Sequence, residues 1–327
     1  MAILVAWMKR IGVITSGGDA PGMNAAVRAI VRAAMARGTE VVGFVHGYQG
    51  IIDGEINPLD TKSVGGIIHL GGTILRTARS DEFRRHEGRA KAAAQLEKHG
   101  VGGLVVVGGD GSLTGARALF EEFGFPVVGV PGSIDNDIAG TDFSIGFDTA
   151  VNTAMVAIDK IRDTAYSHDR VFVVEVMGRA NGFIAVEVAL SSGAEAVLVP
   201  EVPYSLFEIC DTLKKGYQRG KRSSIIVVAE GASKAADVKD FISKNTGFEA
   251  RYVVLGHMQR GGSPSAFDRV LALRLGAQAA NRLISGYSGE MVGVDGGNLV
   301  QHPLSYVLSQ SRTIDPAKLL MVDVMAQ

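Results

Sequence analysis

The segment Leu104–Gly124, LVVVGGDGSLTGARALFEEFG, contains the pattern that decides the fold. Its apolar run Leu104–Val107 predicts a β-strand covered on both faces, because such strands are nearly continuous in apolar side chains. The glycine-rich loop Gly108–Ser112 follows this run, and Leu113–Phe123 has the pattern of a helix. Gly124 stands where a helix C-cap belongs. The segment therefore predicts one strand–loop–helix unit.

The same unit recurs along the chain. Further strands are expected at Ile11–Thr15, Val41–His46, Val127–Val130, Val171–Val176, Ala196–Val199, Ile225–Ala229, Val253–Leu255 and Val292–Val294. Further helices are expected at Met23–Arg37, Arg89–His99, Thr149–Thr164, Gly182–Ser191, Ser205–Arg219, Ala235–Thr246 and Ala266–Ser285, with Gly38, Gly100 and Gly220 at helix C-caps. This alternation predicts an α/β fold with mostly parallel sheets. Ligands in such folds bind outside the carboxyl ends of the strands, so the loops directly after the strands are the candidate sites.

Length and composition exclude several classes of protein. A chain of 327 residues suggests two domains, and 46% hydrophobic residues exclude a disordered chain. The formal net charge of -1 argues against a protein that coats nucleic acid. The single cysteine, Cys210, excludes an internal disulfide and a cysteine zinc site, and it suits the reducing cytoplasm. No apolar run approaches the roughly 20 residues of a membrane-spanning helix. We interpret Met1–Trp7 as an extension before an alternative start at Met8, or equally as part of an edge strand.

Two glycine-rich loops before helices suit phosphate binding. Thr15–Asn24, TSGGDAPGMN, and Gly108–Ser112, GGDGS, both follow a strand and open a helix. Bare glycines there let backbone N–H groups approach a phosphate, whose charge the helix dipole favours, although a tight turn alone also needs glycine. Asp110 can hold Mg²⁺ beside the phosphate oxygens or cap the helix. Neither loop is a Walker motif or a dinucleotide fingerprint.

Carboxylates and arginines gather at other strand ends. Pro131–Asp137, PGSIDND, has two carboxylates that can divide base and metal-organising roles, although an Asx-turn alone would also explain them. Arginines occur before or after strands at 170, 179, 251 and 260, together with Met177-Gly178, Glu230-Gly231 and His257. Because the guanidinium fork matches phosphate oxygens, these arginines indicate a phosphorylated substrate.

In this order the motifs resemble those of the bacterial, glycolytic type of ATP-dependent 6-phosphofructokinases. The resemblance extends from Met8 to the C-terminus and rests on Thr15–Asn24, Gly108–Ser112, Pro131–Asp137, Met177–Arg179 and His257–Pro264. It implies two similar three-layer α/β domains with the active site in the cleft between them. The larger, ATP-binding domain would comprise residues 1–145 and 258–308, and the smaller, sugar-phosphate-binding domain residues 146–257 and 309–327.

The resemblance also implies a role for each matching residue. ATP would be bound by Gly18, Arg79, Ser80, Gly109, Asp110, Gly111 and Ser112, with Asp110 on Mg²⁺. Fructose 6-phosphate would be bound by Ser133, Ile134, Asp135, Arg170, Met177, Gly178, Arg179, Glu230, Arg251, His257 and Arg260. The catalytic group would be Asp135 as general base, with Arg179, Arg79 and Ser133. Arg170 and Arg251 would reach the site of a neighbouring subunit, which implies a homotetramer.

Individual residues indicate which phosphoryl donor and which allosteric effector the chain would bind. Gly111 and Gly132 stand where pyrophosphate-dependent relatives carry Asp and Lys, so both favour ATP; a pyrophosphate-dependent enzyme and a catalytically silent nucleotide sensor are the alternatives. Ser133 replaces the usual Thr and keeps the hydroxyl.

An ADP or phosphoenolpyruvate effector would be bound by Arg28, Arg32, Arg162, Gly193, Glu195, Arg219 and Lys221. Glu55 and Ser223 stand where relatives place an effector-binding Arg and a His, so we expect a weakened or altered response.

Overall fold

A computed structural model describes residues 8–326, so the predicted extension Met1–Trp7 lies outside the described residues. The described chain forms two compact units. Unit 1 runs through Ser133 and adds Ile138–Asp148 and Arg260–Ser311, and unit 2 comprises Ile134–Asp137, Thr149–Gln259 and the chain from Arg312. The predicted ranges kept Ile134–Asp137 in the larger domain, whereas the structure groups this segment with unit 2. The reason is local, because the Asn136 carbonyl accepts a hydrogen bond from Arg312 and Asp135 contacts Arg179.

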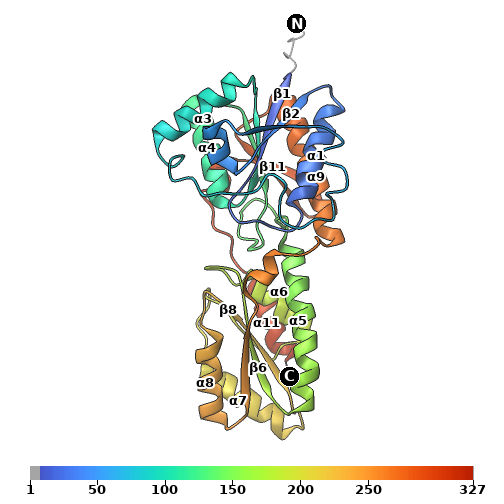
Figure 1. The fold of residues 1–327 in the computed structure, drawn as a ribbon. Helices are drawn as coiled ribbons and strands as arrows, with labels where there is room; N and C mark the ends of the chain where they lie inside the picture. Colours follow the sequence, from blue (N-terminus) through green and yellow to red (C-terminus); the bar gives the residue numbers. More distant parts are fainter. Residues whose placement is uncertain (1–7, 327) are drawn as a thin grey trace. The chain divides into compact units, whose positions relative to one another are not determined.

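Unit 1 is built on a seven-stranded sheet in the order β11-β10-β5-β4-β1-β2-β3 (Figure 1). Its strands are β1 (Arg10–Ser16), β2 (Glu40–Phe44), β3 (Ile56–Leu59), β4 (Leu104–Gly108), β5 (Val127–Pro131), β10 (Glu290–Asp295) and β11 (Asn298–Pro303). All neighbours pair in parallel except the two edge strands, β3 and β11. Helices α1 (Met23–Met35) and α9 (Ala266–Ile284) lie side by side on one face, and α3 (His86–Lys98) and α4 (Asp110–Phe123) cover the other. Unit 1 also contains the short helices α2 (Gly47–Asp53) and α10 (Leu304–Val307).

Unit 2 is built on a four-stranded parallel sheet in the order β7-β8-β6-β9. Its strands are β6 (Val171–Val176), β7 (Ala196–Leu198), β8 (Ser224–Ala229) and β9 (Ala250–Val254). Figure 1 shows α7 (Leu206–Gln218) and α8 (Ala235–Thr246) on one face, and α5 (Phe147–Ser167), α6 (Phe183–Ser192) and α11 (Pro316–Met325) on the other. A short 3₁₀ helix, η1 (Gly256–Arg260), follows β9. Each unit thus has the three layers expected of an α/β fold.

Every expected element forms, some with shifted bounds, as in β9, which was expected at Val253–Leu255. The additional ones are edge strands, short helical segments and the ten-residue helix α11. The four predicted C-cap glycines all have positive φ, from 64° at Gly100 and Gly124 to 95° at Gly220. The sequence analysis did not predict β3, β11, α2, α10, α11 or η1. Proline and exposed polar side chains interrupt the apolar pattern in β3 and β11, because each is an edge strand. Between residues 8 and 326, no helix has the length and apolar character needed to cross a membrane.

Candidate active site

Three of the predicted loops meet at the carboxyl edge of the unit 1 sheet. The parallel register aligns Ser16 of β1 with Gly108 of β4, and Gly108 with Pro131 of β5. The loops that follow these strands are therefore neighbours. A Cβ atom on Gly17 would lie 3.1 Å from the Ser112 Oγ, and Gly17 itself has φ +86°. The glycine-rich loops that the sequence analysis singled out thus lie next to one another.

The loop after β1 has no room for a side chain at Gly18, because an arginine occupies the position of a Cβ atom there. A Cβ atom on Gly18 would lie 2.5 Å from Nη1 of Arg260. The same Nη1 donates a hydrogen bond to the Asp19 carbonyl, 3.1 Å away. Gly18 was predicted to contact ATP and Arg260 to bind the sugar phosphate, and the structure brings the two together within unit 1.

The loop after β4 begins helix α4. Gly109 is the N-cap, and Asp110 is the first helical residue, with its carboxylate in the exposed first turn. A Cβ atom on Gly111 would meet nothing within 4 Å, so space is open above this turn. The Ser112 carbonyl accepts a hydrogen bond of 2.5 Å from the buried Tyr48 hydroxyl, whose pKa burial raises well above its usual value. A helix N-terminus, an exposed carboxylate and open space suit a phosphate with its cation.

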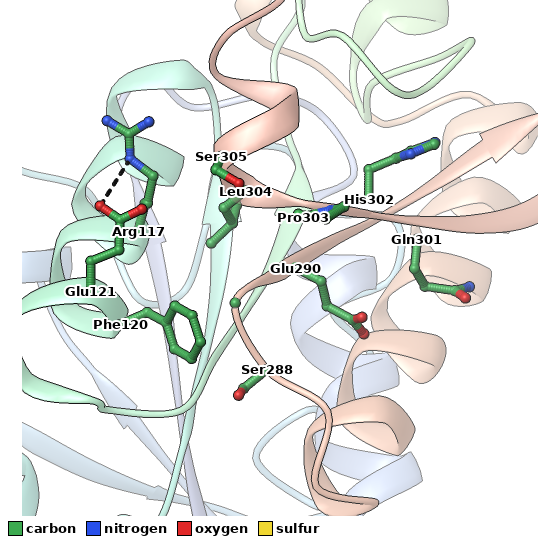
Figure 2. A pocket seen from close by; sticks show the side chains of 11 residues that line it. Arg117, Phe120, Glu121, Ser288, Glu290, Gln301, His302, Pro303, Leu304 and Ser305 are labelled. Carbon is green, nitrogen blue, oxygen red and sulfur yellow. Dashed lines mark ion pairs between the residues drawn. The ribbon is translucent and has the colours of Figure 1, made fainter.

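The other end of α4 borders a cavity of about 270 Å³ that carries none of the predicted site residues (Figure 2). It lies between α4 and the β10–β11 hairpin and is lined by Arg117, Phe120, Glu121, Ser288, Gly289, Glu290, Gln301, His302, Pro303, Leu304 and Ser305. Its arginine is paired with Glu121 at 3.7 Å. Because none of the predicted site residues lines it, we do not assign the active site to this cavity.

Arg79 and Ser80 precede a turn that is tied to helix α2. Arg79 is exposed, whereas the Ser80 Oγ donates to Gln49 Oε1 at 2.7 Å and accepts from the Phe83 amide at 3.1 Å. The Ser80 hydroxyl therefore stabilises the turn, and its predicted contact with ATP stays a prediction. Phe83 stacks on Tyr48 with 4.0 Å between ring centroids.

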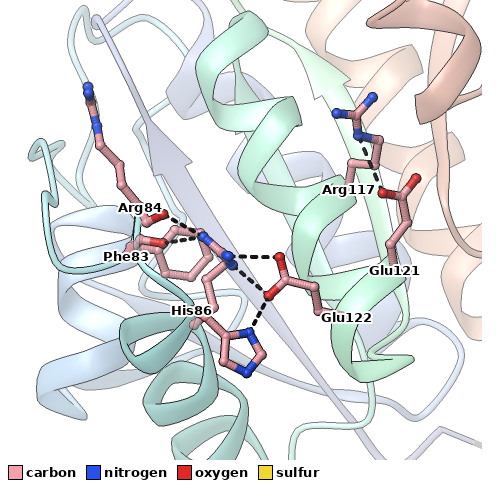
Figure 3. A network of polar contacts seen from close by, with 7 residues as sticks. Phe83, Arg84, His86, Arg117, Glu121 and Glu122 are labelled. Carbon is pink, nitrogen blue, oxygen red and sulfur yellow. Dashed lines mark hydrogen bonds and ion pairs between the residues drawn. The ribbon is translucent and has the colours of Figure 1, made fainter.

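A polar network on α3 and α4 holds the same turn (Figure 3). Arg89 donates to the Phe83 carbonyl at 3.3 Å and to the Arg84 carbonyl at 2.7 Å. Its guanidinium also pairs with Glu122, which accepts from His86 Nδ1 at 2.9 Å as well. The hydrogen bond from Arg89 is the main cause that lowers the pKa of Glu122. Sequence reasoning missed this network, because no local pattern distinguishes these surface charges from others.

In unit 2, a buried carboxylate faces an exposed arginine. The Asp135 side chain is 1% exposed, and its Oδ2 lies 3.3 Å from Nε of Arg179, whose side chain is 61% exposed. Arg179 and Asn136, the residue after Asp135, both have left-handed backbones, with φ of +54° and +52°. Such conformations are uncommon for residues other than glycine and are concentrated at functional sites. Ile134, in the same loop, has a fully buried side chain.

The loop that carries Arg179 is held by side chains from elsewhere in unit 2. The Glu230 Oε1 accepts hydrogen bonds from the Gly178 amide at 3.2 Å and the Arg179 amide at 2.8 Å. The Met177 amide donates to Gln259 Oε1 at 2.9 Å. Glu230 was predicted to bind the sugar, and this contact stays a prediction; in the structure its Oε1 accepts hydrogen bonds from the loop. Gln259 was not predicted at all.

The two arginines predicted to serve a neighbouring subunit lie together, since Arg170 directly precedes β6 and Arg251 is on the adjacent strand β9. β6 and β9 pair in parallel, and Glu249 Oε1 lies 2.9 Å from Nε of Arg170 and 2.7 Å from Nη2 of Arg251. Hydrogen bonds from both arginines lower the pKa of Glu249, that from Arg170 most. His257, in η1, is exposed. The sequence analysis did not name Glu249, which pairs with both arginines.

Comparison with known proteins identifies the family. The phosphofructokinase family profile matches residues 10–283. The chain is 58% identical over 308 residues to a protein of Bacillus mycoides named ATP-dependent 6-phosphofructokinase, covering 94% of this chain and 96% of that protein. The chain belongs to the phosphofructokinase family.

Solved phosphofructokinases have the same fold. The structure of phosphofructokinase from Saccharomyces cerevisiae matches with a TM-score of 0.86 at 37% identity, over 92% of this chain. This chain spans only 45% of that longer one. A pyrophosphate-dependent phosphofructokinase from Marinobacter aquaeolei matches with a TM-score of 0.83 at 22% identity, over 94% of this chain and 86% of that one, which shows the fold alone.

The predicted effector residues are divided between the two units. Arg28 and Arg32 lie on α1 of unit 1, and the others lie in unit 2. Arg162 donates to the Ser192 carbonyl at 2.5 Å, next to Gly193, and borders a hollow of about 540 Å³ that Ser223 also lines. Arg219 is the C-cap of α7.

Glu195 is the most constrained of the predicted effector residues. Its side chain is 4% exposed, its Oε1 lies 2.6 Å from Lys221 Nζ, and its Oε2 accepts from the Ile225 amide. In unit 1, Glu55 Oε2 lies 3.2 Å from His46 Nδ1. We expected Glu195 and Glu55 to influence effector binding. Both carboxylates are already paired with side chains of the protein.

Proposed function

We propose that the chain is an ATP-dependent 6-phosphofructokinase, which transfers the γ-phosphoryl group of ATP to the 1-hydroxyl of fructose 6-phosphate and releases ADP and fructose 1,6-bisphosphate. The observation that carries the proposal is the 58% identity over 94% of the chain to proteins with that name. This reaction is the committed step of glycolysis, and a cytoplasmic location is part of the proposal.

The residues of unit 2 suit proton removal and charge stabilisation. Asp135 takes the proton from the sugar 1-hydroxyl as that oxygen attacks phosphorus, which is the task of a general base. Its 1% exposure keeps competing water away from the carboxylate. Arg179, 3.3 Å from Asp135, is exposed enough to leave this pair and to offset the charge of the transferring phosphoryl group, as Arg79 of unit 1 also would. With Arg170 and Arg251, the residues that hold the sugar phosphate are Ser133, Ile134, Met177, Gly178, Glu230, His257 and Arg260.

The residues of unit 1 suit the nucleotide. The backbone amides at the start of α4 and the bare loop after β1 bind phosphate oxygens. The site fits Mg²⁺, because the exposed Asp110 carboxylate stands in the first turn of α4 beside open space at Gly111. One carboxylate together with phosphate oxygens and waters is a usual coordination for this ion. When bound, Mg²⁺ neutralises charge on the phosphates.

The donor follows from two glycines. A side chain at Gly111 would project into the open space that the nucleotide needs, and Asp there would add a negative charge. A Cβ atom at Gly132 would lie 3.2 Å from the Met23 side chain and 3.3 Å from that of Val107, so a lysine would require its neighbours to shift. Pyrophosphate as donor is therefore not favoured, and the presence of Asp135, Asp110 and Arg179 argues against a silent nucleotide sensor.

The proposal includes assembly and regulation. Arg170 and Arg251 serve the site of a neighbouring subunit in a homotetramer, as in the family that the chain resembles. ADP or phosphoenolpyruvate is the effector of the site that includes Glu195, with a weakened response.

A coupled assay tests the proposal. Purified protein is given fructose 6-phosphate with either ATP or pyrophosphate, and fructose 1,6-bisphosphate is measured. We expect product with ATP and none with pyrophosphate. Product with pyrophosphate would overturn the donor assignment, and ATP binding without product from either donor would favour the sensor.

A further inference from the structure

Gln259 is a completely buried polar side chain next to the proposed sugar-phosphate residues. It has 0% exposure and lies in η1 between His257 and Arg260. It is also the last residue of the long segment of unit 2 before the chain returns to unit 1. Burial of an amide is costly unless the amide is hydrogen-bonded, so its contacts indicate why it is there.

Its two amide atoms have different partners in unit 2. The Oε1 accepts from the Met177 amide at 2.9 Å, and the Nε2 donates to the Ala150 carbonyl on α5 at 3.4 Å. The orientation of the amide group is unambiguous, because a backbone N–H can only donate and a carbonyl can only accept. Gln259 thus connects η1, α5 and the end of β6.

The hydrogen bond between Met177 and Gln259 lies where β6 ends and the loop Met177–Arg179 begins. Sheet pairing carries β6 as far as Val176, whose carbonyl accepts from the Glu230 amide at 2.9 Å. Past this point Gly178 and Arg179 have φ of +149° and +54°, and Glu230 accepts hydrogen bonds from both amides. Three successive amides, two of them in residues with positive φ, therefore donate to two side chains. Glu230 is exposed and Gln259 is not, so water can replace Glu230 far more readily than Gln259.

We propose that Gln259 is a positioning residue, which sets the loop Met177–Arg179 through the Met177 amide and thereby holds Arg179 beside Asp135. It touches no substrate. The inference rests on the proposed function only in assigning this loop to fructose 6-phosphate. Loss of the acceptor leaves a buried N–H without a partner, which favours other loop conformations.

Three variants separate positioning from packing. Gln259→Met keeps the length of the side chain and removes the acceptor. Gln259→Glu keeps the acceptor, and burial favours the protonated acid, whose O–H can donate to Ala150. Gln95→Met is the matched control, because Gln95 is a partly buried glutamine on α3 of unit 1 whose Oε1 has no hydrogen-bond partner. Steady-state kinetics are measured with each substrate in turn, together with hydrogen exchange at the Met177 amide.

We expect Gln259→Met to raise the KM for fructose 6-phosphate about tenfold, which corresponds to about 1.4 kcal/mol, and to leave the KM for ATP within about twofold. Exchange at Met177 should accelerate in Gln259→Met, and Gln259→Glu and Gln95→Met should resemble the wild type in both measurements. Unchanged KM and exchange in Gln259→Met, or equal increases in both KM values, would overturn the proposal. If Gln259→Met does not fold, Gln259→Asn, which withdraws the amide by one methylene, must give the same split. A wild type without kinase activity would refute the proposed function alone, since exchange at Met177 would still decide the role of Gln259.

Discussion

Replacement of Asp135 by asparagine should abolish most of the turnover and leave the protein folded. Asparagine has nearly the same size as aspartate, so it fits the buried position, which is 1% exposed. It cannot accept the proton of the attacking hydroxyl. A positioned general base contributes roughly 10²–10⁴-fold, so we expect kcat to fall by about that factor, equivalent to about 2.7–5.5 kcal/mol in the barrier.

The structure separates this effect from a loss of stability. The variant also loses the ion pair with Arg179, 3.3 Å away, but that arginine is 61% exposed and regains water. Because one partner is exposed, loss of this pair should cost less folding stability than the about 3–5 kcal/mol of breaking a fully buried pair. Freed from the carboxylate, Arg179 can bind a phosphate at least as well as before. We therefore expect an unchanged or lower KM for fructose 6-phosphate.

The assay measures kcat and KM in Asp135→Asn beside Asp237→Asn. The control makes the same charge change at an exposed position in the first turn of α8. Thermal melting of both variants checks folding. A folded Asp135→Asn protein that retained more than about a tenth of the wild-type kcat would refute the assignment of the general base.

Four further outcomes test other parts of the molecule. Gly111→Asp should fold, because its side chain meets open space and a helix N-terminus accepts an acid, yet it should weaken ATP binding; equal ATP affinity would contradict the donor argument. Arg251→Ala should raise the KM for fructose 6-phosphate far more than that for ATP, and its mixture with Asp135→Asn should regain activity in hybrid tetramers; no recovery despite subunit exchange would count against shared sites. Since the pKa of Glu122 is lowered in the fold, its ion pairs stabilise the protein above the unfolded-state pKa of about 4.3 and are lost as pH falls through the lower folded value. Melting temperatures of the wild type and Glu122→Gln should thus differ at pH 7 and converge in acid, and a constant difference would refute this cause. Cys210 is buried and burial raises its pKa, so a disulfide reagent should modify it far faster in denaturant than in the native protein; equal rates would contradict its burial.

The sequence predicted the parts of the fold whose signal is local. Strands such as β4 have continuous apolar side chains because helices cover both faces of the sheet. The loops after β1, β4 and β5 could be found because a parallel sheet collects its carboxyl ends at one edge, where the register aligns Ser16 with Gly108. The edge strands β3 and β11 gave no comparable signal, since each is partly exposed and contains proline.

The residues that hold the site in shape could not be predicted, because their partners are distant in sequence. Gln259 lies 82 residues from Met177, and Arg89 lies 33 residues from Glu122. A glutamine or an arginine has no periodicity or spacing that marks it as a support. Only the fold shows that Glu249 binds two arginines that look independent in the sequence.

In the effector region, the ion-pair partner of a carboxylate determines what that carboxylate can bind. By residue type, Glu195 is suited to bind the cation of a nucleotide. In the structure it is buried, paired with Lys221 and bonded to the Ile225 amide, so it can bind a cation only after Lys221 moves away. An anionic effector supplies a reason for that movement, because a phosphate attracts the lysine and exposes the carboxylate at the same time. Glu55 is half exposed beside His46, so no buried ion pair has to break there. It would act on an anion by repulsion alone. If these residues bind the proposed effector, both carboxylates reduce its affinity: Glu195 through the cost of releasing Lys221 from a buried ion pair, and Glu55 through repulsion.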